Sequence, residues 1–360
     1  MNLPAEIAEE TSTSRALTRN GNPSEFLSEV ELFLSNTLPD NQIELEPIEV
    51  KSVEGLRNSS PAKYGYYNRA LLNEVKNLNN FLSECNKILS EGQYFMFTFK
   101  TKAIRSKQLF EKYPRPIGYP FFAWDFFVHR VMPKLSLTKN IYFHFTDGRY
   151  KSISMSECLA RIVCSGFTIE GYNAFDDKNI CLVQKTGRPQ FSDQITKGLL
   201  ISLPRIGYNG ELIRVYKFRT MHPYSEFLQE YLYENNGTKD GDKIINDFRV
   251  TRWGKFFRKY WIDEIPMLIN YLKGDLKLVG VRPLSEHKFL TYPVWLQKAR
   301  IRVKPGLIPP YYADMPETPE EFYEAERAYL EEYSKRPLRT DLKYFRKSLF
   351  NILFKGARSK

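Results

Sequence analysis

The stretch "DFRVTRWGKFFRKYWIDEIPMLINYLKGDLKLVGVRP", residues 247–283, predicts two consecutive amphipathic helices. Thr251 is suited to cap the first helix, because its hydroxyl can accept a backbone N–H of the first turn. Apolar residues recur at i, i+3, i+4 and i+7 in both helices, which is typical of a helix with one buried face. They are Trp253, Phe256, Phe257 and Tyr260 in the first helix, and Ile265, Leu268, Ile269 and Leu272 in the second. Gly274 is placed to end the second helix.

Two adjacent carboxylates precede the second helix. Pro266 fits only the first helical turn, because its missing N–H costs nothing there, and this puts Asp263 near the N-cap and Glu264 near the first helical position. The pair can be explained by capping and by a favourable position in the helix dipole. It can also be catalytic, since an ionised Asp is a nucleophile toward phosphorus and a neighbouring Glu can help to hold a divalent cation. The residues alone leave both interpretations open.

A β-hairpin is predicted within "RIGYNGELIRVYKFRTM", residues 205–221, because Asn209-Gly210 separates two apolar runs. The second strand places Lys217 and Arg219 on one face, since side chains two residues apart in a strand point the same way. Two cations so arranged could hold a diphosphate. They could also form a solvated basic surface.

Two basic turns follow. Arg282 precedes Pro283, which favours an extended backbone and could direct the guanidinium at a phosphate. Lys304 opens a Lys-Pro-Gly turn within "RIRVKPGLIPPYYAD", residues 300–314. Each turn is equally well explained as a structural turn with a basic residue at the surface.

The C-terminal segment "DLKYFRKSLFNILFKGARSK", residues 341–360, predicts a basic amphipathic helix. Its apolar side is formed by Leu342, Phe345, Leu349, Ile352 and Leu353, and the basic residues around it are Lys343, Arg346, Lys347 and Lys355. Such a helix can lie on an anionic bilayer or pack on the protein.

The upstream region is predicted to hold a polar arm or linker over residues 1–63 and a small α/β module over residues 64–184. Residues 185–360 are expected to form a helix-rich domain with short strands, so that the fold class is α/β (α+β). In the module we expect a helix over 71–88, strands over 94–100, 140–148, 167–175 and 179–187, and a helix capped by Ser154 and Glu157 and closed by Gly166. Because the module has no glycine-rich nucleotide loop, no chemistry is assigned to it.

The composition excludes several classes of protein. The 360 residues are 42% hydrophobic and 26% charged, which is typical of a globular protein, and the net charge of +11 suits an anionic partner. No stretch approaches the roughly 20 apolar residues of a transmembrane helix, and the first thirty residues do not form a secretory signal. Four cysteines without CxxC spacing and four scattered histidines indicate neither a disulfide scaffold nor a zinc site. We expect reduced thiols in a cytosolic compartment.

These motifs, in this order, resemble the bacterial sugar transferase family. The family comprises the monotopic polyprenyl-phosphate phosphoglycosyl transferases that start O-antigen, capsule and exopolysaccharide synthesis. The matching segments are "YKFRTM" (216–221), the stretch 247–283, "VKPG" (303–306) and "TDLKYF" (340–345). The resemblance covers roughly residues 199–345 and leaves residues 1–180 unexplained.

The resemblance implies transfer of a phosphosugar from a nucleoside-diphosphate sugar, usually a UDP-sugar, to a polyprenyl phosphate. Asp263 matches the nucleophile that forms a covalent phosphosugar intermediate. Glu264 matches its partner carboxylate, and both are associated with the required Mg²⁺. Arg282 belongs to the Gly-x-Arg-Pro turn near the phosphates. The other positions implied to line the cavity are Lys217, Arg219, Asp247, Arg249 and Lys304.

Three features depart from the family pattern. No hydrophobic re-entrant helix precedes residue 199, and the longest apolar candidate, "IGYPFFAWDFFVH" (117–129), lies far upstream and carries Asp125. Val281 replaces the usual proline before Arg282, and Ile308-Pro309 replaces the usual Thr-Gly.

We therefore expect peripheral docking at the inner face of the bacterial cell membrane, through the basic surface and the C-terminal helix. A membrane protein partner is the other way in which the chain could reach the membrane. The alternative function is a non-catalytic nucleotide-sugar-binding or regulatory subunit of a membrane transferase. Nucleic acid is not an expected partner, because the basic residues belong to the transferase motifs and are not gathered on a recognition helix.

Overall fold

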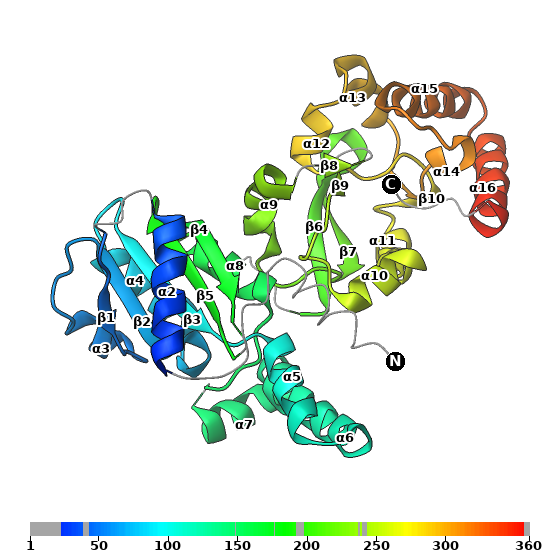
Figure 1. Ribbon diagram of the computed structural model, residues 1–360. Coiled ribbons are helices and arrows are strands. Elements are labelled where there is room, and N and C mark those ends of the chain that lie inside the picture. Colours follow the sequence, from blue (N-terminus) through cyan, green and yellow to red (C-terminus); the bar gives the residue numbers. More distant parts are fainter. Residues whose placement is uncertain are drawn as a thin grey trace. The chain divides into compact units, whose positions relative to one another are not determined.

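The computed structural model describes residues 23–38, 43–147, 149–175, 177–191, 198–236, 238–239 and 243–355, and it has the expected α/β fold (Figure 1). The chain forms two compact units. The first comprises residues 1–197, 222–235 and 247–249. The second comprises residues 198–221, 236–246 and 250–360.

A five-stranded sheet forms the centre of the first unit, with the strand order β1-β2-β3-β5-β4. The strands are β1 (Glu46–Ile48), β2 (Gly65–Leu71), β3 (Tyr94–Phe99), β4 (Phe167–Ala174) and β5 (Asn179–Lys185). β1, β2 and β3 are parallel, and β5 runs antiparallel between β3 and β4. The strands expected near 94–100, 167–175 and 179–187 are confirmed.

Helices cover both faces of this sheet (Figure 1). The helix α2 (Pro23–Thr37) brings Val30 into a core cluster with Met96 and Leu182. Phe95 and Phe97 point to the opposite face because side chains alternate along a strand, and their rings stack with centroids 4.4 Å apart. The helices α4 (Leu78–Ile88) and α8 (Met155–Cys164) pack on that face. The Ser154 hydroxyl accepts the Glu157 N–H at 3.2 Å, which confirms the predicted cap of α8.

Three expectations for this unit differ from the structure. Residues 1–22 lie outside the described residues, but residues 23–57 contribute α2, β1 and α3 (Val53–Arg57) instead of a polar linker, because Val30, Leu38 and Leu45 are buried in the core. The helix expected from residue 71 begins only at Leu78, because residues 65–71 pair with β3 as a strand.

The prediction of a strand over residues 140–148 is wrong. Residues 136–146 form the helix α7 (Ser136–Thr146). Asp147 then adopts a left-handed conformation with φ 52° at the helix C-cap. The Asp-Gly signal therefore ends a helix here instead of making a hairpin.

The first unit also contains α5 (Lys102–Lys112) and α6 (Arg115–Phe126), a π-helical turn η2 (Phe127–Val131) and the short helix η3 (Met132–Lys134). With α7 they form an insertion between β3 and α8. The remaining helical segments of the first unit lie outside this insertion. They are η1 (Leu72–Glu74), η5 (Ser225–Leu228) and α9 (Gln229–Asn236).

The second unit begins with the predicted hairpin. β6 (Leu200–Ile206) and β7 (Leu212–Phe218) pair antiparallel with Ile206 opposite Leu212, and the turn contains Asn209 and Gly210 with φ of 54° and 80°. β10 (Lys277–Val279) and β11 (Gly306–Ile308) form a parallel pair, and β8 (Thr238–Lys239) pairs with β9 (Lys243–Ile244). The helices are α10 (Arg252–Lys259), η6 (Ile262–Glu264), α11 (Met267–Lys273), α12 (Glu286–Leu290), α13 (Val294–Arg300), α14 (Tyr311–Asp314), α15 (Pro319–Lys335) and α16 (Pro337–Phe354), and η4 (Tyr208–Gly210) lies in the hairpin turn.

The apolar stripes of α10 and α11 are exposed, which corrects the buried face expected for α10. Trp253 is 71% exposed and Leu272 is 83% exposed. Only Gly254 of α10 is buried, because α10 approaches so closely that a Cβ there would lie 2.0 Å from the Thr220 carbonyl oxygen. Among the described residues, no helix combines the length and the apolar character needed to cross a membrane.

Candidate active site

The two adjacent carboxylates lie in a 3₁₀ turn between α10 and α11. Trp261, just before this turn, has a left-handed backbone with φ 54° and ψ 17°, which is rare for a bulky residue. Its indole N–H donates to the Tyr312 hydroxyl at 3.1 Å, and the two rings meet edge to face. This contact holds the bend that leads into Asp263 and Glu264.

The helix α11 begins later than the sequence predicted, with Pro266 at its N-cap. Asp263 and Glu264 therefore precede the helix by about one turn, and neither side chain caps it. Side-chain capping of α11 by the two carboxylates is therefore not observed.

Lys217 and Glu264 are brought together by the packing of β7 against α11. The buried Asn270 of α11 accepts the Tyr216 N–H at 3.0 Å and donates to the Arg214 carbonyl at 2.7 Å. Lys217, next along β7, then places its Nζ 2.7 Å from Glu264 Oε1. Burial lowers the pKa of Lys217, although the Glu264 carboxylate acts in the opposite direction.

Asp263 is half-buried and adjacent to this pair. Its partial burial, and then the Glu264 charge, raise the pKa of Asp263 above its ordinary value, while Lys217 and Arg258 act against this. Arg258 is held in place by donating from Nε to the Thr220 hydroxyl at 3.0 Å. The pKa shifts of Asp263 and Lys217 mark an electrostatically strained cluster, which is typical of active sites.

Arg282 adds a further cation to the site. Its guanidinium donates to the Tyr311 hydroxyl at 3.3 Å, and the proximity of Tyr311 and then of Glu264 raises the pKa of Arg282. Burial, and then the charge of Arg282, lower the pKa of Arg205 on β6. The like charges of Arg205 and Arg282 are therefore close to each other, and an anion between them would relieve the repulsion.

The position of Arg282 depends on two features of the second unit. A Cβ on Gly306 would lie 2.1 Å from the Gly280 nitrogen, so only glycine allows β10 and β11 to approach so closely. The buried Arg300 donates to the Arg282 carbonyl and forms an ion pair with the buried Glu326. Together these contacts hold the turn that carries the Arg282 guanidinium.

The remaining predicted site residues make other contacts. Arg219 donates from Nε to the Gly198 carbonyl at 3.0 Å. Lys304 is exposed near Gly274, at the opposite end of α11 from Asp263. Asp247 and Arg249 belong to the first unit, where Arg249 Nη2 lies 2.8 Å from Asp247 Oδ2. The structure therefore brings together Lys217, Asp263, Glu264 and Arg282.

Sequence analysis missed several residues of this site. They are Arg205, Arg258, Trp261, Asn270, Arg300, Tyr311, Tyr312 and Glu326. Asn270 could have been found, because it is a lone amide in the apolar helix "MLINYLK". The others had no local signal, since their roles depend on contacts across long sequence separations.

Two neighbouring carboxylates thus lie beside a partly buried lysine and two arginines, an arrangement whose cations are suited to phosphate groups. Residues 193–355 match the model of the bacterial sugar transferase family. This match confirms, for residues 193–355, the resemblance seen in the motifs.

Relatives with sugar transferase names also match part of the chain. The chain is 41% identical over 109 residues to the galactosyl transferase CpsE of Streptococcus agalactiae, a match covering 30% of this chain and 24% of the relative. It is 39% identical over 93 residues to the undecaprenyl-phosphate galactose phosphotransferase of Salmonella typhimurium, covering 24% and 20%. It is 28% identical over 144 residues to the UDP-glucose:undecaprenyl-phosphate glucose-1-phosphate transferase of Xanthomonas campestris, covering 37% and 28%. The chain thus matches less than a third of the length of each of these relatives.

Proposed function

We propose that this protein transfers a phosphosugar from a nucleoside-diphosphate sugar, with UDP as the nucleotide, to a polyprenyl phosphate, as an early step of surface polysaccharide synthesis. The observation that carries the proposal is the Asp263-Glu264 pair held beside Lys217 and Arg282 within the sugar transferase domain. The names of the Salmonella and Xanthomonas relatives support the lipid acceptor, and the Xanthomonas name supports the UDP-sugar donor.

The proposed reaction has two steps. A carboxylate oxygen of Asp263 bonds to the β-phosphorus, the bond from that phosphorus to the bridging oxygen breaks, and the nucleoside monophosphate leaves. A phosphate oxygen of the polyprenyl phosphate then bonds to the same phosphorus and releases Asp263. The cations Lys217, Arg205 and Arg282 stabilise the charge on the transferring phosphate. Partial burial favours the reaction because a desolvated carboxylate is a stronger nucleophile.

Magnesium is proposed as the cofactor, and Asp263 and Glu264 are the residues that would hold it. No cluster of three or more metal-ligating side chains occurs among the described residues. Two carboxylates fit Mg²⁺, which commonly binds one or two carboxylates together with water and substrate phosphates. Bound there, the ion would neutralise charge on the diphosphate.

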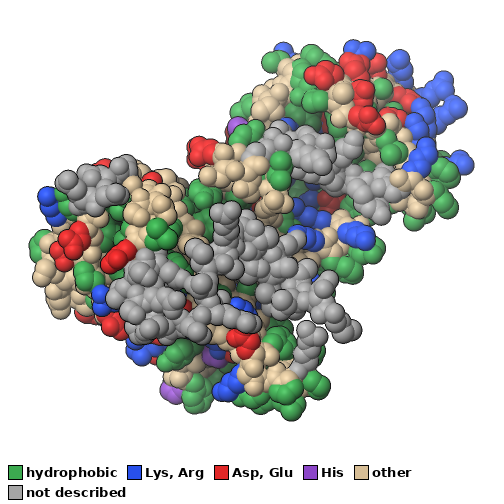
Figure 2. Space-filling model, viewed as in Figure 1, with side chains coloured by type: hydrophobic (Ala, Val, Ile, Leu, Met, Phe, Trp, Pro, Cys, Tyr) green, Lys and Arg blue, Asp and Glu red, His purple; other side chains and the backbone are tan. Residues whose placement is uncertain are grey.

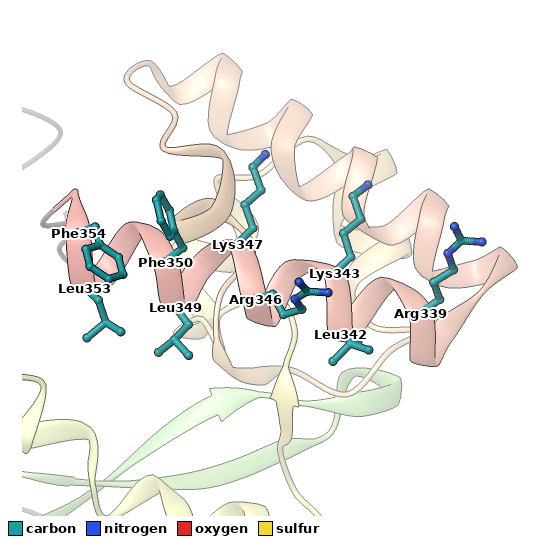
Figure 3. Close-up of a pocket in the computed structure, with 9 residues that line it drawn as sticks. All are labelled: Arg339, Leu342, Lys343, Arg346, Lys347, Leu349, Phe350, Leu353 and Phe354. Carbon is teal, nitrogen blue, oxygen red and sulfur yellow. The ribbon is translucent and has the colours of Figure 1, made fainter.

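Docking at the inner face of the bacterial membrane is the third part of the proposal. The exposed stripes of α10 and α11 lie in the same unit as the catalytic carboxylates. A groove runs along α16, and Figure 3 shows its leucines on one side of the helix and its lysines on the other. The lining residues are Arg339, Leu342, Lys343, Arg346, Lys347, Leu349, Phe350, Leu353 and Phe354.

One side of the helix α16 packs on the protein, and its other side is exposed and could contact a bilayer. Tyr344, Ser348 and Asn351 are buried against the unit, and Asn351 donates to the Tyr312 and Ala313 carbonyls at 3.0 and 2.8 Å. Its leucines and basic residues remain on the outer side. Such a surface is suited to an anionic bilayer that carries the lipid acceptor.

The function is tested by incubating the protein with Mg²⁺, polyprenyl phosphate and a panel of UDP-sugars while UMP release is measured. We expect release with at least one donor, and a loss of about 10³-fold or more in Asp263→Asn. Glu324→Gln, at an exposed position of α15, is the matched control and should keep its activity. Release that Asp263→Asn leaves intact would refute the catalytic assignment, and donor binding without any release would favour a non-catalytic subunit.

A further inference from the structure

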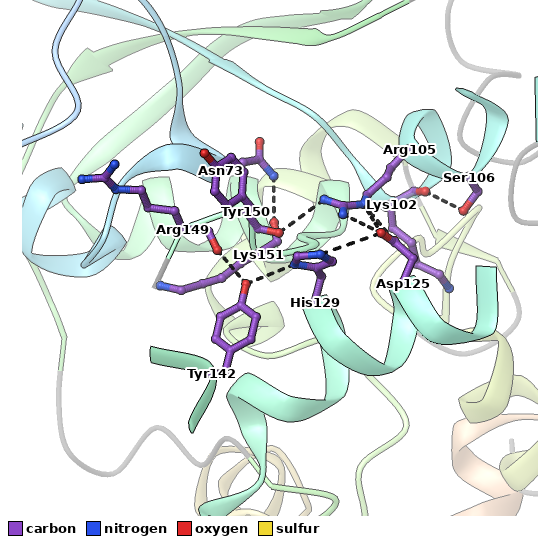
Figure 4. A network of polar contacts seen from close by, with 10 residues as sticks. All are labelled: Asn73, Lys102, Arg105, Ser106, Asp125, His129, Tyr142, Arg149, Tyr150 and Lys151. Carbon is purple, nitrogen blue, oxygen red and sulfur yellow. Dashed lines mark hydrogen bonds and ion pairs between the residues drawn. The ribbon is translucent and has the colours of Figure 1, made fainter. Parts of the chain in front are cut away.

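The helical insertion of the first unit, residues 102–146, collects polar groups on its inner side (Figure 4). Arg105 Nε on α5 donates to Asp125 Oδ2 on α6 at 2.8 Å. His129 Nε2 lies 4.0 Å from Asp125 Oδ1, and His129 Nδ1 lies 3.3 Å from the Tyr142 hydroxyl on α7. The acidic residue within the apolar segment 117–129 is therefore ion-paired on the inside of the insertion.

This network also fixes the orientation of the insertion on the first unit. The Tyr142 hydroxyl donates to the Arg149 carbonyl at 2.6 Å, and Arg105 Nη1 donates to the Tyr150 carbonyl at 3.3 Å. Asn73, next to β2, donates to the Lys151 carbonyl at 2.9 Å. Because the polar groups of α5, α6 and α7 meet on this side, their other side is turned outward.

The outer side of the insertion is strongly apolar. Leu137 is 87% exposed, Phe145 is 81% exposed and Trp124 is 67% exposed. The other large apolar side chains exposed there are Ile117, Tyr119, Phe121, Phe127, Leu135 and Ile141. Figure 2 shows hydrophobic side chains gathered at the outer edge of this region. We call these nine residues the aromatic face.

The arrangement is the reverse of that in a water-soluble helical hairpin, whose apolar stripe faces the core. Ionisable groups inside and apolar groups outside are characteristic of protein segments that contact lipid. Gly118 lets α6 pack tightly on α5, since a Cβ there would lie 2.9 Å from the Phe110 ring. The part of the aromatic face that lies on α6 is therefore carried by a helix packed closely on α5.

The charges near the aromatic face indicate which surface it contacts. Lys102, Lys112 and Lys151 lie over aromatic rings of the insertion, those of Phe126, Tyr113 and Phe143, at 5.2, 5.5 and 5.1 Å. The acidic Asp147 is ion-paired with Lys76. Lysines beside aromatic rings fit the headgroup region of an anionic bilayer, where cationic and amphipathic side chains are favoured.

We propose that the aromatic face docks on an anionic lipid bilayer, with Trp124 and Leu137 entering the interfacial region. The helix α6 continues into η2, and this run carries Asp125, His129 and Arg130. Because no helix among the described residues is long and apolar enough to cross a membrane, α6 would lie in the interface. This inference deepens the proposed function, because it gives the first unit a role in reaching a lipid acceptor. It concerns a surface separate from α10, α11 and α16.

Vesicle flotation of the full chain tests the inference. The vesicles contain phosphatidylcholine, with or without about 30% phosphatidylglycerol. The double variant Trp124→Ser/Leu137→Ser should bind anionic vesicles about tenfold or more weakly, because two large exposed side chains no longer leave water. Leu32→Ser, at an exposed apolar position of α2, is the matched control and should bind like the wild type. Neutral vesicles should bind the wild type more weakly than anionic ones.

Binding that is unchanged in the double variant would overturn the proposal, and so would equal binding to neutral and anionic vesicles. Circular dichroism and the melting temperature should match the wild type, because both substituted side chains are exposed. UMP release with a short water-soluble prenyl phosphate should also be unchanged in the double variant. If the wild type floats, the double variant floats more weakly and the wild type releases no UMP, the proposed reaction fails while the lipid-docking face stands.

Discussion

Lys217 Nζ lies 2.7 Å from Glu264 Oε1, and both side chains are less than one-fifth exposed. The pair joins the end of β7 to the 3₁₀ turn that carries Asp263. The charge of Lys217 compensates that of Glu264. Asp263 forms no ion pair with any residue in the part of the chain that the structure describes. This asymmetry is consistent with the roles in the proposed reaction, in which Glu264 is held by the protein and Asp263 is the nucleophile.

Lys217→Met should lower kcat/KM for UMP release by about 10²-fold or more, because one preorganised cation at the phosphates is lost. Lys217→Arg should recover part of this activity, since it restores the charge. Lys273→Met, on the exposed side of α11, is the control. Steady-state kinetics with the preferred donor would measure all three, and full activity in Lys217→Met would exclude Lys217 from the site.

In the metal-free protein, the pKa of Asp263 should lie above that of an ordinary aspartate. The ordinary value is about 4. Carboxyl-selective NMR of the wild type and of Glu264→Gln would measure its pKa. The pKa should fall in Glu264→Gln, because the neighbouring negative charge is removed and Lys217 is freed. A midpoint that does not move would show that Glu264 has no electrostatic effect on Asp263.

Asp263→Asn should stabilise the protein at neutral pH. A raised pKa means that the native state binds the proton more tightly than the unfolded chain, so ionisation above that pKa weakens the native state. The gain should be present above the native-state pKa and should disappear as the pH falls below the unfolded value. Melting temperatures of the wild type and Asp263→Asn, measured from about pH 3 to about pH 8, would test the sign of this stability change. A loss of stability in Asp263→Asn at pH 7 would contradict it.

Arg300→Met should destabilise the sugar transferase domain by about 3–5 kcal/mol, because Glu326 would keep a buried charge without its partner. Arg300→Met/Glu326→Leu should recover much of this stability in chemical denaturation. It should not recover activity, because the Arg282 carbonyl still lacks its donor. Recovery of both would mean that Arg300 has no positioning role.

Leu349→Ser/Leu353→Ser should reduce binding of the protein to anionic vesicles by about tenfold, because two exposed leucines of α16 no longer leave water. Lys347→Ser should have a smaller effect, since Lys347 already pairs with Asp314 at 2.7 Å. Flotation at low and high salt would separate the apolar and electrostatic contributions. Unchanged binding of the double variant would remove α16 from the membrane contact.

The sequence predicted the elements whose signals are local. Asn209-Gly210 marked the β6–β7 hairpin, and Thr251 marked the start of α10, where its hydroxyl accepts the Gly254 N–H at 2.9 Å. The ordered motifs around Asp263 and Arg282 indicated the family. These predictions succeeded because turn geometry, capping and motif spacing depend on residues close together in the chain.

Two predictions failed for one reason. The apolar stripe of α10 was expected to be buried, and the aromatic segment over 140–148 was expected to be a strand. In both, the local side-chain pattern does not determine what packs against the segment. The buried residues are Gly254 in α10 and Met267 and Asn270 in α11, whereas Trp253, Phe256, Leu268 and Leu272 are exposed.

By itself, the sequence determined the sugar transferase domain, its hairpin and the two acids to which the chemistry is assigned. Only the tertiary structure decided that Lys217 meets Glu264, that Arg205 faces Arg282, and that Asp247 and Arg249 pair within the first unit. It also decided which apolar faces remain exposed. The physical reason is that charge pairing and burial depend on distances between residues far apart in the chain, and local pattern carries no information about those distances.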